Sequence, residues 1–290
     1  MNNLATLTNL DDGDLHQGEY QQLTTHYDKK YKTGWYFMHA QPRSCFTTLL
    51  LDEINDYQQS VKHEMLNTKQ KKYDYLVLAS DVEGIFNLGG DLAVFFELIK
   101  QQNKAGLLEY AIKCINVLYQ NMIHLDSELT TISLVKGDAL GGGFEAALSS
   151  NILIAEKGSK LGLPEVLFNL FPGMGAYSLL TRKVSRTKAE EIILSGKLYT
   201  AEELYDLGVV DVLTEPGKGE MAVYQYIKTA NSKSNSYSAI RNVRDICSKI
   251  SYDELLDITK IWVESAIKLT KKDLRMMERL VMRQTAKNSD

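Results

Sequence analysis

One stretch, residues 133–148, constrains this chain most, because it carries three consecutive glycines between a buried segment and a helix. The apolar run at 132–135 predicts a buried strand, residues 137–143 predict a tight turn, and residues 144–148 predict the opening of a helix. A glycine has no Cβ, so its backbone N–H can approach a ligand closely, and the first N–H groups of a helix have no partner within it. The stretch is therefore suited to hold a partial or full negative charge.

Two glutamates accompany this turn. Glu145 lies two residues beyond Gly143, and Glu165 follows one short predicted strand later, in the sequence Leu163-Pro-Glu165. Two carboxylates beside an anion-stabilising turn favour a site that moves protons next to an oxyanion. Two plainer interpretations stay open: the glycines only pack a helix onto a sheet, and Glu145 only stabilises the helix dipole. A phosphate-binding loop fits less well, because neither a Gly-Lys-Ser/Thr ending nor G-x-G-x-x-G spacing occurs here.

A second glycine turn lies upstream and repeats the same order of elements. Residues 75–79 predict a fully apolar strand, residues 86–92 hold the glycines, and residues 91–100 predict a helix. A repeated order of strand, turn and helix predicts an α/β fold with both turns at one edge of the sheet. Two backbone donors, one from each turn, can then converge on a single oxygen.

The other periodic segments place these turns within a larger chain. Residues 1–30 are polar and predict an N-terminal extension, residues 31–215 predict the core, and residues 216–290 predict a mostly helical region. We expect a polar connection at 62–72. Further strands are expected at 35–39, 152–155 and 209–213, and further helices at 46–57, 105–124, 187–194, 200–207, 251–269 and 271–283.

Composition disfavours several classes of function. The 290 residues are 44% hydrophobic and 24% charged, as in an ordinary soluble globular protein. A net charge of −4 argues against a nucleic-acid partner, which needs clustered basic residues. The 3 cysteines and 5 histidines have neither disulfide-framework nor metal-ligand spacing, so no metal is expected. No apolar run reaches the roughly 18 residues that span a bilayer, which predicts no membrane insertion and a cytoplasmic location.

Four motifs, in this order, resemble those of the crotonase, or enoyl-CoA hydratase/isomerase, superfamily. They are Phe86-Asn-Leu-Gly-Gly-Asp-Leu92, Gly137-Asp-Ala-Leu-Gly-Gly-Gly-Phe-Glu145, Leu163-Pro-Glu-Val-Leu-Phe168 and Phe171-Pro-Gly-Met-Gly175. With Ile261-Trp-Val263 and Leu274-Arg-x-Met-x-Arg-Leu280, the chain is more narrowly similar to the diffusible signal factor synthases. The resemblance implies a crotonase-like β-β-α spiral with a helical C-terminal region that closes an acyl pocket and contributes to oligomer contacts. Trimers or hexamers are the assemblies that it implies.

The same resemblance gives roles to individual residues. It implies backbone N–H donors to an oxyanion at Gly90 and Gly142, and acid/base carboxylates at Glu145 and Glu165. For Trp262, which it places against the substrate, ordinary packing in the core is an equally open interpretation. The substrate contacts that it implies come from both glycine turns, a following loop and the C-terminal helices: Gly89, Leu140, Gly141, Met174, Trp262 and Leu280.

Resemblance to the signal synthases implies a reaction in two steps. A 3-hydroxyacyl thioester on acyl carrier protein loses water, and hydrolysis of the thioester then releases a cis-2-unsaturated fatty acid used in quorum sensing. The acyl group is carried as a phosphopantetheine thioester, so no separate cofactor is expected, and a membrane sensor kinase is an implied partner. The segment Gln41-Pro-Arg-Ser-Cys-Phe46 does not look like the usual CoA-contacting segment, which favours a carrier protein over CoA.

Two other functions stay open at this point. An ordinary enoyl-CoA hydratase or isomerase of fatty-acid metabolism uses the same residues and differs in its substrate. A crotonase-like scaffold that docks on another protein is the third possibility, although the presence of both Glu145 and Glu165 argues against a purely structural role.

Overall fold

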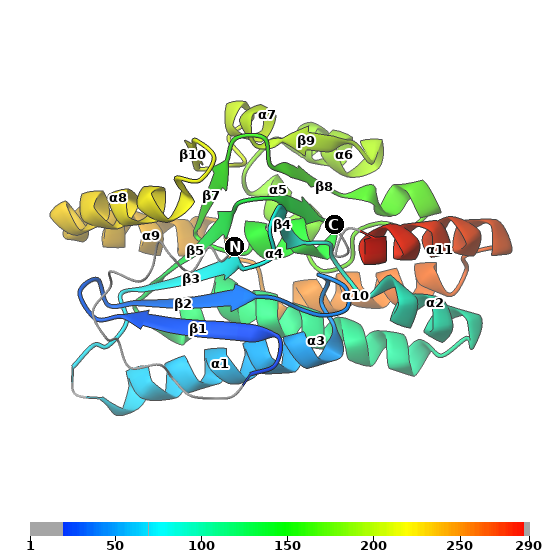
Figure 1. The fold of residues 1–290 in the computed structure, drawn as a ribbon, viewed down its shortest axis with the longest axis horizontal. Helices are drawn as coiled ribbons and strands as arrows, with labels where there is room; N and C mark the ends of the chain where they lie inside the picture. Colours follow the sequence, from blue (N-terminus) through cyan, green and yellow to red (C-terminus); the bar gives the residue numbers. More distant parts are fainter. Residues whose placement is uncertain (1–19, 69, 287–290) are drawn as a thin grey trace.

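Residues 20–68 and 70–286, which the computed structural model describes, form two sheets with helices packed on them (Figure 1). Most of the predicted N-terminal extension, residues 1–19, lies outside the described residues. The first strand of the larger sheet begins at Leu23 and forms a hairpin with the second strand, so a boundary at residue 30 divides that hairpin.

The larger sheet has the strand order β1-β2-β3-β5-β7-β10. β1 and β2 pair antiparallel, and all later neighbours pair parallel. Every residue of β3 and β7 is buried, because helices cover both faces of a parallel sheet, and this explains their largely apolar sequences. The strands are β1 (Leu23–Asp28), β2 (Thr33–Met38), β3 (Tyr75–Ser80), β5 (Thr130–Val135), β7 (Ile152–Glu156) and β10 (Val212–Thr214).

The smaller sheet has the order β4-β6-β8-β9, and its first three strands are also parallel. From β3 onward each long strand leads into a short one and then into a helix, in β3-β4-α2, β5-β6-α4 and β7-β8-η3. This repeat is the predicted β-β-α spiral, which is confirmed. The prediction of an uninterrupted turn at 137–143 is wrong, because β6 lies inside it and pairs with β4. The strands are β4 (Ile85–Asn87), β6 (Asp138–Leu140), β8 (Lys160–Gly162) and β9 (Leu198–Thr200).

Some of the helices begin where a side chain caps them. Asp91 accepts hydrogen bonds from Ala93 N and Val94 N at the start of α2, and Thr200 forms a capping box with Glu203 at the start of α7. The helices are α1 (Thr48–Asn67), α2 (Leu92–Lys100), α3 (Lys104–Met122), η2 (His124–Asp126), α4 (Gly142–Leu148), η3 (Pro164–Phe168), α5 (Ala176–Thr181), α6 (Arg186–Ser195), α7 (Ala201–Asp206), α8 (Gly219–Ser232), α9 (Ser234–Cys247), α10 (Tyr252–Ala266) and α11 (Lys271–Ala286).

Helix α1 is longer than the sequence indicated. The predicted polar connection at 62–72 is wrong over its first part, since α1 continues to Asn67. Val61 is fully buried and Met65, one turn further on, packs against the same core, so the apolar face continues beneath the polar residues.

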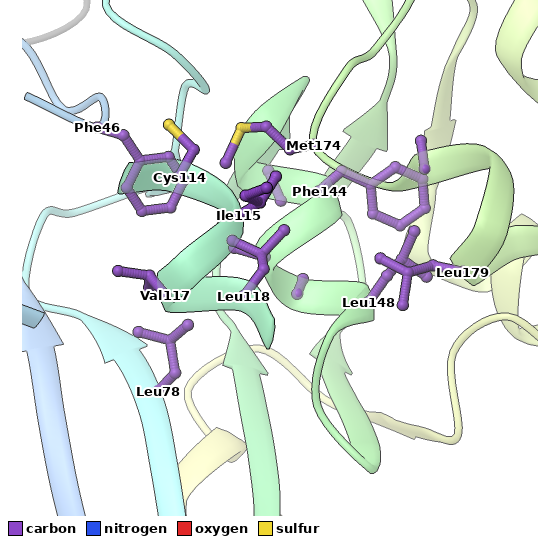
Figure 2. Packing of buried hydrophobic residues seen from close by; sticks show 14 of the residues in the cluster. Phe46, Leu78, Cys114, Ile115, Val117, Leu118, Phe144, Leu148, Met174 and Leu179 are labelled. Atoms are coloured by element: carbon purple, nitrogen blue, oxygen red, sulfur yellow. The ribbon is translucent and has the colours of Figure 1, made fainter. Parts of the chain in front are cut away.

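Helix α3 is wedged into the core beside α4. Ile115 and Leu118 of α3 lie between Phe46 on one side and Phe144 and Leu148 of α4 on the other (Figure 2). All of these side chains are at most 2% exposed, so the packing leaves α4 little freedom to move. The glycine turn that opens α4 is thereby held against a rigid support.

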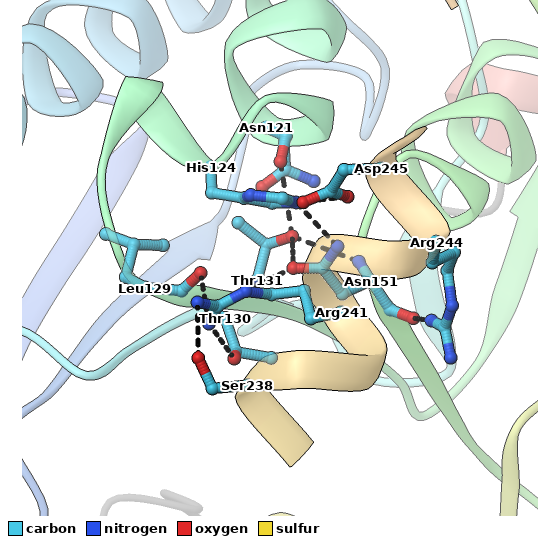
Figure 3. A network of polar contacts seen from close by, with 10 residues as sticks. All are labelled: Asn121, His124, Leu129, Thr130, Thr131, Asn151, Ser238, Arg241, Arg244 and Asp245. Atoms are coloured by element: carbon cyan, nitrogen blue, oxygen red, sulfur yellow. Dashed lines mark hydrogen bonds and ion pairs between the residues drawn. The ribbon is translucent and has the colours of Figure 1, made fainter. Parts of the chain in front are cut away.

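The C-terminal helices cover different parts of the molecule. Helix α8 packs on β5, β7 and β10, α10 packs on α3, and α11 packs on α2 and η3. Helix α9 has no buried residue and is held by polar contacts (Figure 3). Arg241 donates to Leu129 O at 3.1 Å, and Arg244 donates to Asn151 O at 2.8 Å. Among residues 20–68 and 70–286, no helix has the length and apolar character that crossing a membrane requires.

Candidate active site

The two glycine turns lie side by side because β4 and β6 are neighbours. Gly89 and Gly90 follow β4, and Gly141 and Gly142 follow β6. A Cβ added to Gly142 would lie 3.4 Å from Gly90 N and 3.5 Å from the Cα of Gly89. Gly89 and Gly141 have φ of +92° and +54°, a region that side chains strongly disfavour. The backbone nitrogens of Gly90 and Gly142 are thus brought close together, as the sequence predicted.

Glu145 stands in the first turn of α4 and is 1% exposed. Its Oε1 accepts hydrogen bonds from Met174 N at 2.8 Å and from Ala176 N at 2.9 Å. Burial raises the pKa of Glu145 to about 7, while these backbone donors favour the ionised form and limit the rise. The loop before α5 therefore sets both the position and the charge of this carboxylate.

Glu165 belongs to η3, and its carboxylate lies beside Gly141 of the second glycine turn. Its Oε1 lies 2.5 Å from where a Cβ of Gly141 would stand, so the missing side chain of that glycine makes room for the carboxylate. In the described part of the chain its Oε2 is buried and accepts no hydrogen bond. Burial, and then the charge of Glu145, raise the pKa of Glu165 to about 8. Near neutral pH the two carboxyl groups therefore hold about one proton between them.

The glutamates and glycines open onto an apolar cavity of about 250 Å³. Every residue that the sequence placed in the site lines it, from the glycine turns to the C-terminal helices. Their catalytic roles stay predictions, whereas their convergence is an observation. The predicted residues that line the cavity are Gly89, Gly90, Leu140, Gly141, Gly142, Glu145, Glu165, Met174, Trp262 and Leu280.

Trp262 is packed in the core and also lines the cavity, while its contact with the substrate stays a prediction. It is 5% exposed and packs edge-to-face on Phe95 with ring centroids 5.0 Å apart. It also stands over Gly173, where an added Cβ would lie 2.4 Å from the indole ring, and it lines the cavity. Packing in the core and contact with the cavity are therefore compatible for this side chain.

Helices α2 and α3 supply cavity residues that the sequence interpretation missed. Phe95 comes from α2, and Tyr110, Ala111 and Cys114 come from α3. The available signal was the helical spacing of small and apolar residues on α3, which also fits plain core packing. Tertiary structure was needed to show that this face meets the glycine turns.

The fold and this pair of carboxylates define a crotonase-type site. The enoyl-CoA hydratase/isomerase family matches residues 51–274, and the chain belongs to that family. A stretch of 171 residues is 33% identical to the fatty acid oxidation complex subunit alpha of Pseudomonas syringae pv. tomato. That match covers 57% of this chain and 22% of the relative, so the chain spans about a fifth of the relative's length.

Solved structures share the fold at low sequence identity. The enoyl-CoA hydratase of Bacillus halodurans is 19% identical with a TM-score of 0.75, and the match covers 89% of this chain and 100% of that one. The human mitochondrial Δ3-Δ2-enoyl-CoA isomerase is 16% identical with a TM-score of 0.73, covering 91% and 98%. DspI of Pseudomonas aeruginosa is 19% identical with a TM-score of 0.64, covering 80% and 89%. The predicted crotonase-like fold is confirmed by these similarities.

Proposed function

We propose that this protein dehydrates a 3-hydroxyacyl thioester to a 2-enoyl thioester and then hydrolyses the thioester, which releases a 2-unsaturated fatty acid. The observation that carries the proposal is that Glu145 and Glu165 line one apolar cavity together with both glycine turns. Burial raises the pKa of Glu145 to about 7 and that of Glu165 to about 8, which suits one of them to hold a proton while the other is ionised. Dehydration needs one ionised and one protonated group at the same moment, and this pair supplies both.

The dehydration follows from the charges of the two carboxylates. The ionised carboxylate takes the C2 proton, and negative charge then develops on the thioester oxygen. The protonated carboxyl gives its proton to the 3-hydroxyl group as the C3–O bond breaks. Water leaves, the C2–C3 double bond forms, and the glutamate pair again holds one proton.

The glycine turns supply the stabilisation of the intermediate. With their nitrogens brought together, N–H groups of Gly90 and Gly142 are suited to donate to the thioester oxygen. Loss of one such donor typically costs about 2.7–4 kcal/mol of transition-state stabilisation. Attack of water on the thioester carbonyl places charge on the same oxygen, so hydrolysis uses the same two donors.

We propose a carrier-protein thioester as the substrate because segment 41–46 does not look like the usual CoA-contacting segment. Arg43 pairs with both carboxylate oxygens of Asp91 at 2.9 Å, and Phe46 N donates to Gly89 O at 2.8 Å. These groups are used to hold the glycine turn after β4. The motif resemblance to diffusible signal factor synthases supports the cis-2-unsaturated signal as the product, carried until release on phosphopantetheine.

Substitution of each glutamate tests the proposal. Glu145→Gln and Glu165→Gln should each lower the kcat for dehydration of a 3-hydroxyacyl-carrier-protein thioester by at least about 100-fold, because a positioned acid or base contributes that much. Glu156→Gln is the matched control: Glu156 is 6% exposed and bonded to Gly219 N, and it does not line the cavity. Normal turnover by either site variant would exclude the two-glutamate mechanism.

An ordinary enoyl-CoA hydratase or isomerase is the second candidate, and the family match favours it. Hydration of crotonyl-CoA, followed at the absorbance of the conjugated thioester, separates the two candidates. Fast hydration together with inactivity on the carrier-protein thioester would assign the protein to this second class. Mass spectrometry of lipids released by cells that express the chain would identify a free 2-unsaturated acid directly.

A further inference from the structure

A tyrosine hydroxyl holds the peptide that follows Gly90. Tyr110, from α3, is 5% exposed, and its hydroxyl accepts a hydrogen bond from Asp91 N at 3.0 Å. The same hydroxyl donates to the carbonyl oxygen of Phe46. In the parallel pairing of Phe46 with Gly90, Asp91 N–H and the Phe46 carbonyl are the groups that form the next rung. The hydroxyl therefore contacts both groups of this rung where the chain turns from β4 into α2.

The neighbouring rungs of the same pairing are direct. Leu88 N donates to Ser44 O at 2.7 Å, and Phe46 N donates to Gly89 O at 2.8 Å. Phe46 N thus holds the carbonyl of the Gly89–Gly90 peptide, which carries the Gly90 N–H. On the side of α2, the hydroxyl of Tyr110 holds the next peptide as well.

The ring of Tyr110 acts on the same peptide through a second residue. Its centroid lies 5.0 Å from that of Phe95 in an edge-to-face arrangement. Phe95 in turn fills the space beside Gly90, since a Cβ there would lie 2.6 Å from Phe95 Cζ. Hydroxyl and ring together limit the movement of the peptide on two sides.

We propose that Tyr110 is a positioning residue of the oxyanion hole, which helps to aim the Gly90 N–H at the thioester oxygen. Its hydroxyl holds the Gly90–Asp91 peptide on one side of that N–H, and it also holds the carbonyl of Phe46, whose own N–H binds the carbonyl of the Gly89–Gly90 peptide. The inference rests on the proposed use of Gly90 as a donor. In this role Tyr110 does not touch the reacting atoms, because its hydroxyl group donates its hydrogen bond to the carbonyl oxygen of Phe46. Burial raises the pKa of Tyr110 well above its ordinary value, so the hydroxyl donates and accepts at every working pH.

Tyr110→Phe removes the hydroxyl and keeps the ring. We expect kcat to fall about 10- to 100-fold with KM within about twofold, since a displacement of about 1 Å in an active site can cost 10²-fold. Dehydration and thioester hydrolysis should fall by the same factor. Hydrogen exchange of the amides at 88–92 should become faster, because Asp91 N–H has lost its hydrogen bond to the hydroxyl.

Tyr252→Phe is the matched control. Its hydroxyl donates to Asn116 Oδ1 at 2.8 Å, on the same helix α3, and it does not line the cavity. Tyr110→Phe loses two hydrogen bonds and Tyr252→Phe loses one, and both variants keep the ring on or against α3. Normal kcat and normal exchange at 88–92 are expected only in the control. A loss of kcat as large in the control would show general loosening of α3 and would overturn the proposal.

Two further outcomes also decide the matter. Wild-type kcat and unchanged exchange in Tyr110→Phe would overturn the proposal. Should that variant fail to fold, 4-aminophenylalanine at position 110 replaces it. Its amino group still donates to the Phe46 carbonyl but is a weaker acceptor for Asp91 N–H. Wild-type kcat in this protein would overturn the proposal equally. If the wild-type protein does not act on the carrier-protein thioester, the function proposed above fails, and the comparison is made with crotonyl-CoA hydration and with hydrogen exchange, which needs no substrate.

Discussion

Gly142→Ala tests the shared oxyanion hole without removing a titratable group. Gly142 is the first residue of α4 and has no positive φ, so its backbone accepts alanine. The added Cβ would lie 2.6 Å from Met174 Sδ, which must retreat by roughly 1 Å to reach an ordinary contact of 3.5–4.0 Å. A methionine side chain is flexible enough for this, so we expect little loss of stability.

The methyl group would then stand beside the oxyanion position and displace the thioester oxygen. Loss of that hydrogen bond should cost about 2.7–4 kcal/mol, or about 10²- to 10³-fold in kcat. Steady-state assays of dehydration and of thioester hydrolysis should show falls by similar factors, because both steps place charge on one oxygen. Gly219→Ala is the control: Gly219 also opens a helix, and its Cβ would also meet buried atoms, at 2.8 Å, far from the cavity. Retention of one activity at full rate in Gly142→Ala would refute a shared hole and require two sites.

Four shorter predictions follow from the same geometry. Gly90→Ala should lower the melting temperature as well as kcat, since its Cβ would lie 2.6 Å from the packed ring of Phe95; calorimetry and turnover measured together check this. The pH profile of kcat/KM for dehydration, which reports the free enzyme, should be bell-shaped with its maximum between about 7 and about 8, because Glu145 and Glu165 must hold one proton between them; a flat profile from pH 6 to 9 would contradict it. Glu165→Gln should stabilise the fold by on the order of 1–3 kcal/mol at pH 9, and this gain should shrink as the pH falls to 5. The raised pKa of Glu165 in the folded state destabilises the wild-type protein only at pH values where the carboxyl group is ionised in the unfolded chain. Urea unfolding at both pH values measures the difference. Trp262→Ala should widen the cavity and shift the products to longer acyl chains, and an unchanged chain-length profile by mass spectrometry would make this residue plain core packing.

Much of the fold could be predicted from the sequence because its signals are local. The apolar run of β3 and the caps of α2 and α7 depend on residues within one or two turns of each other, and these elements were predicted close to their observed bounds. The short strands were different. Strands β4 and β6 have three residues each, too few to show a period, and they are strands because they pair with one another across fifty residues of chain.

For the site, residue types and order were sufficient to name the two glutamates and the glycine turns. Glycines that lie close to a glutamate along the chain are visible directly in the sequence. The raised pKa values were beyond its reach, because they arise from burial of Glu145 and Glu165 and from backbone N–H groups of the loop before α5.

Tertiary structure alone decided which other parts of the chain support these residues. Tyr110 and Phe95 have the spacing of ordinary core residues, and nothing local distinguishes them from their neighbours on α3 and α2. They act on Gly90 because packing of α2 and α3 places a hydroxyl and a ring beside one peptide. Contacts between residues far apart in sequence are set by the summed packing of many side chains. The sequence by itself therefore identified the reactive groups, and the tertiary structure decided which residues hold them in position.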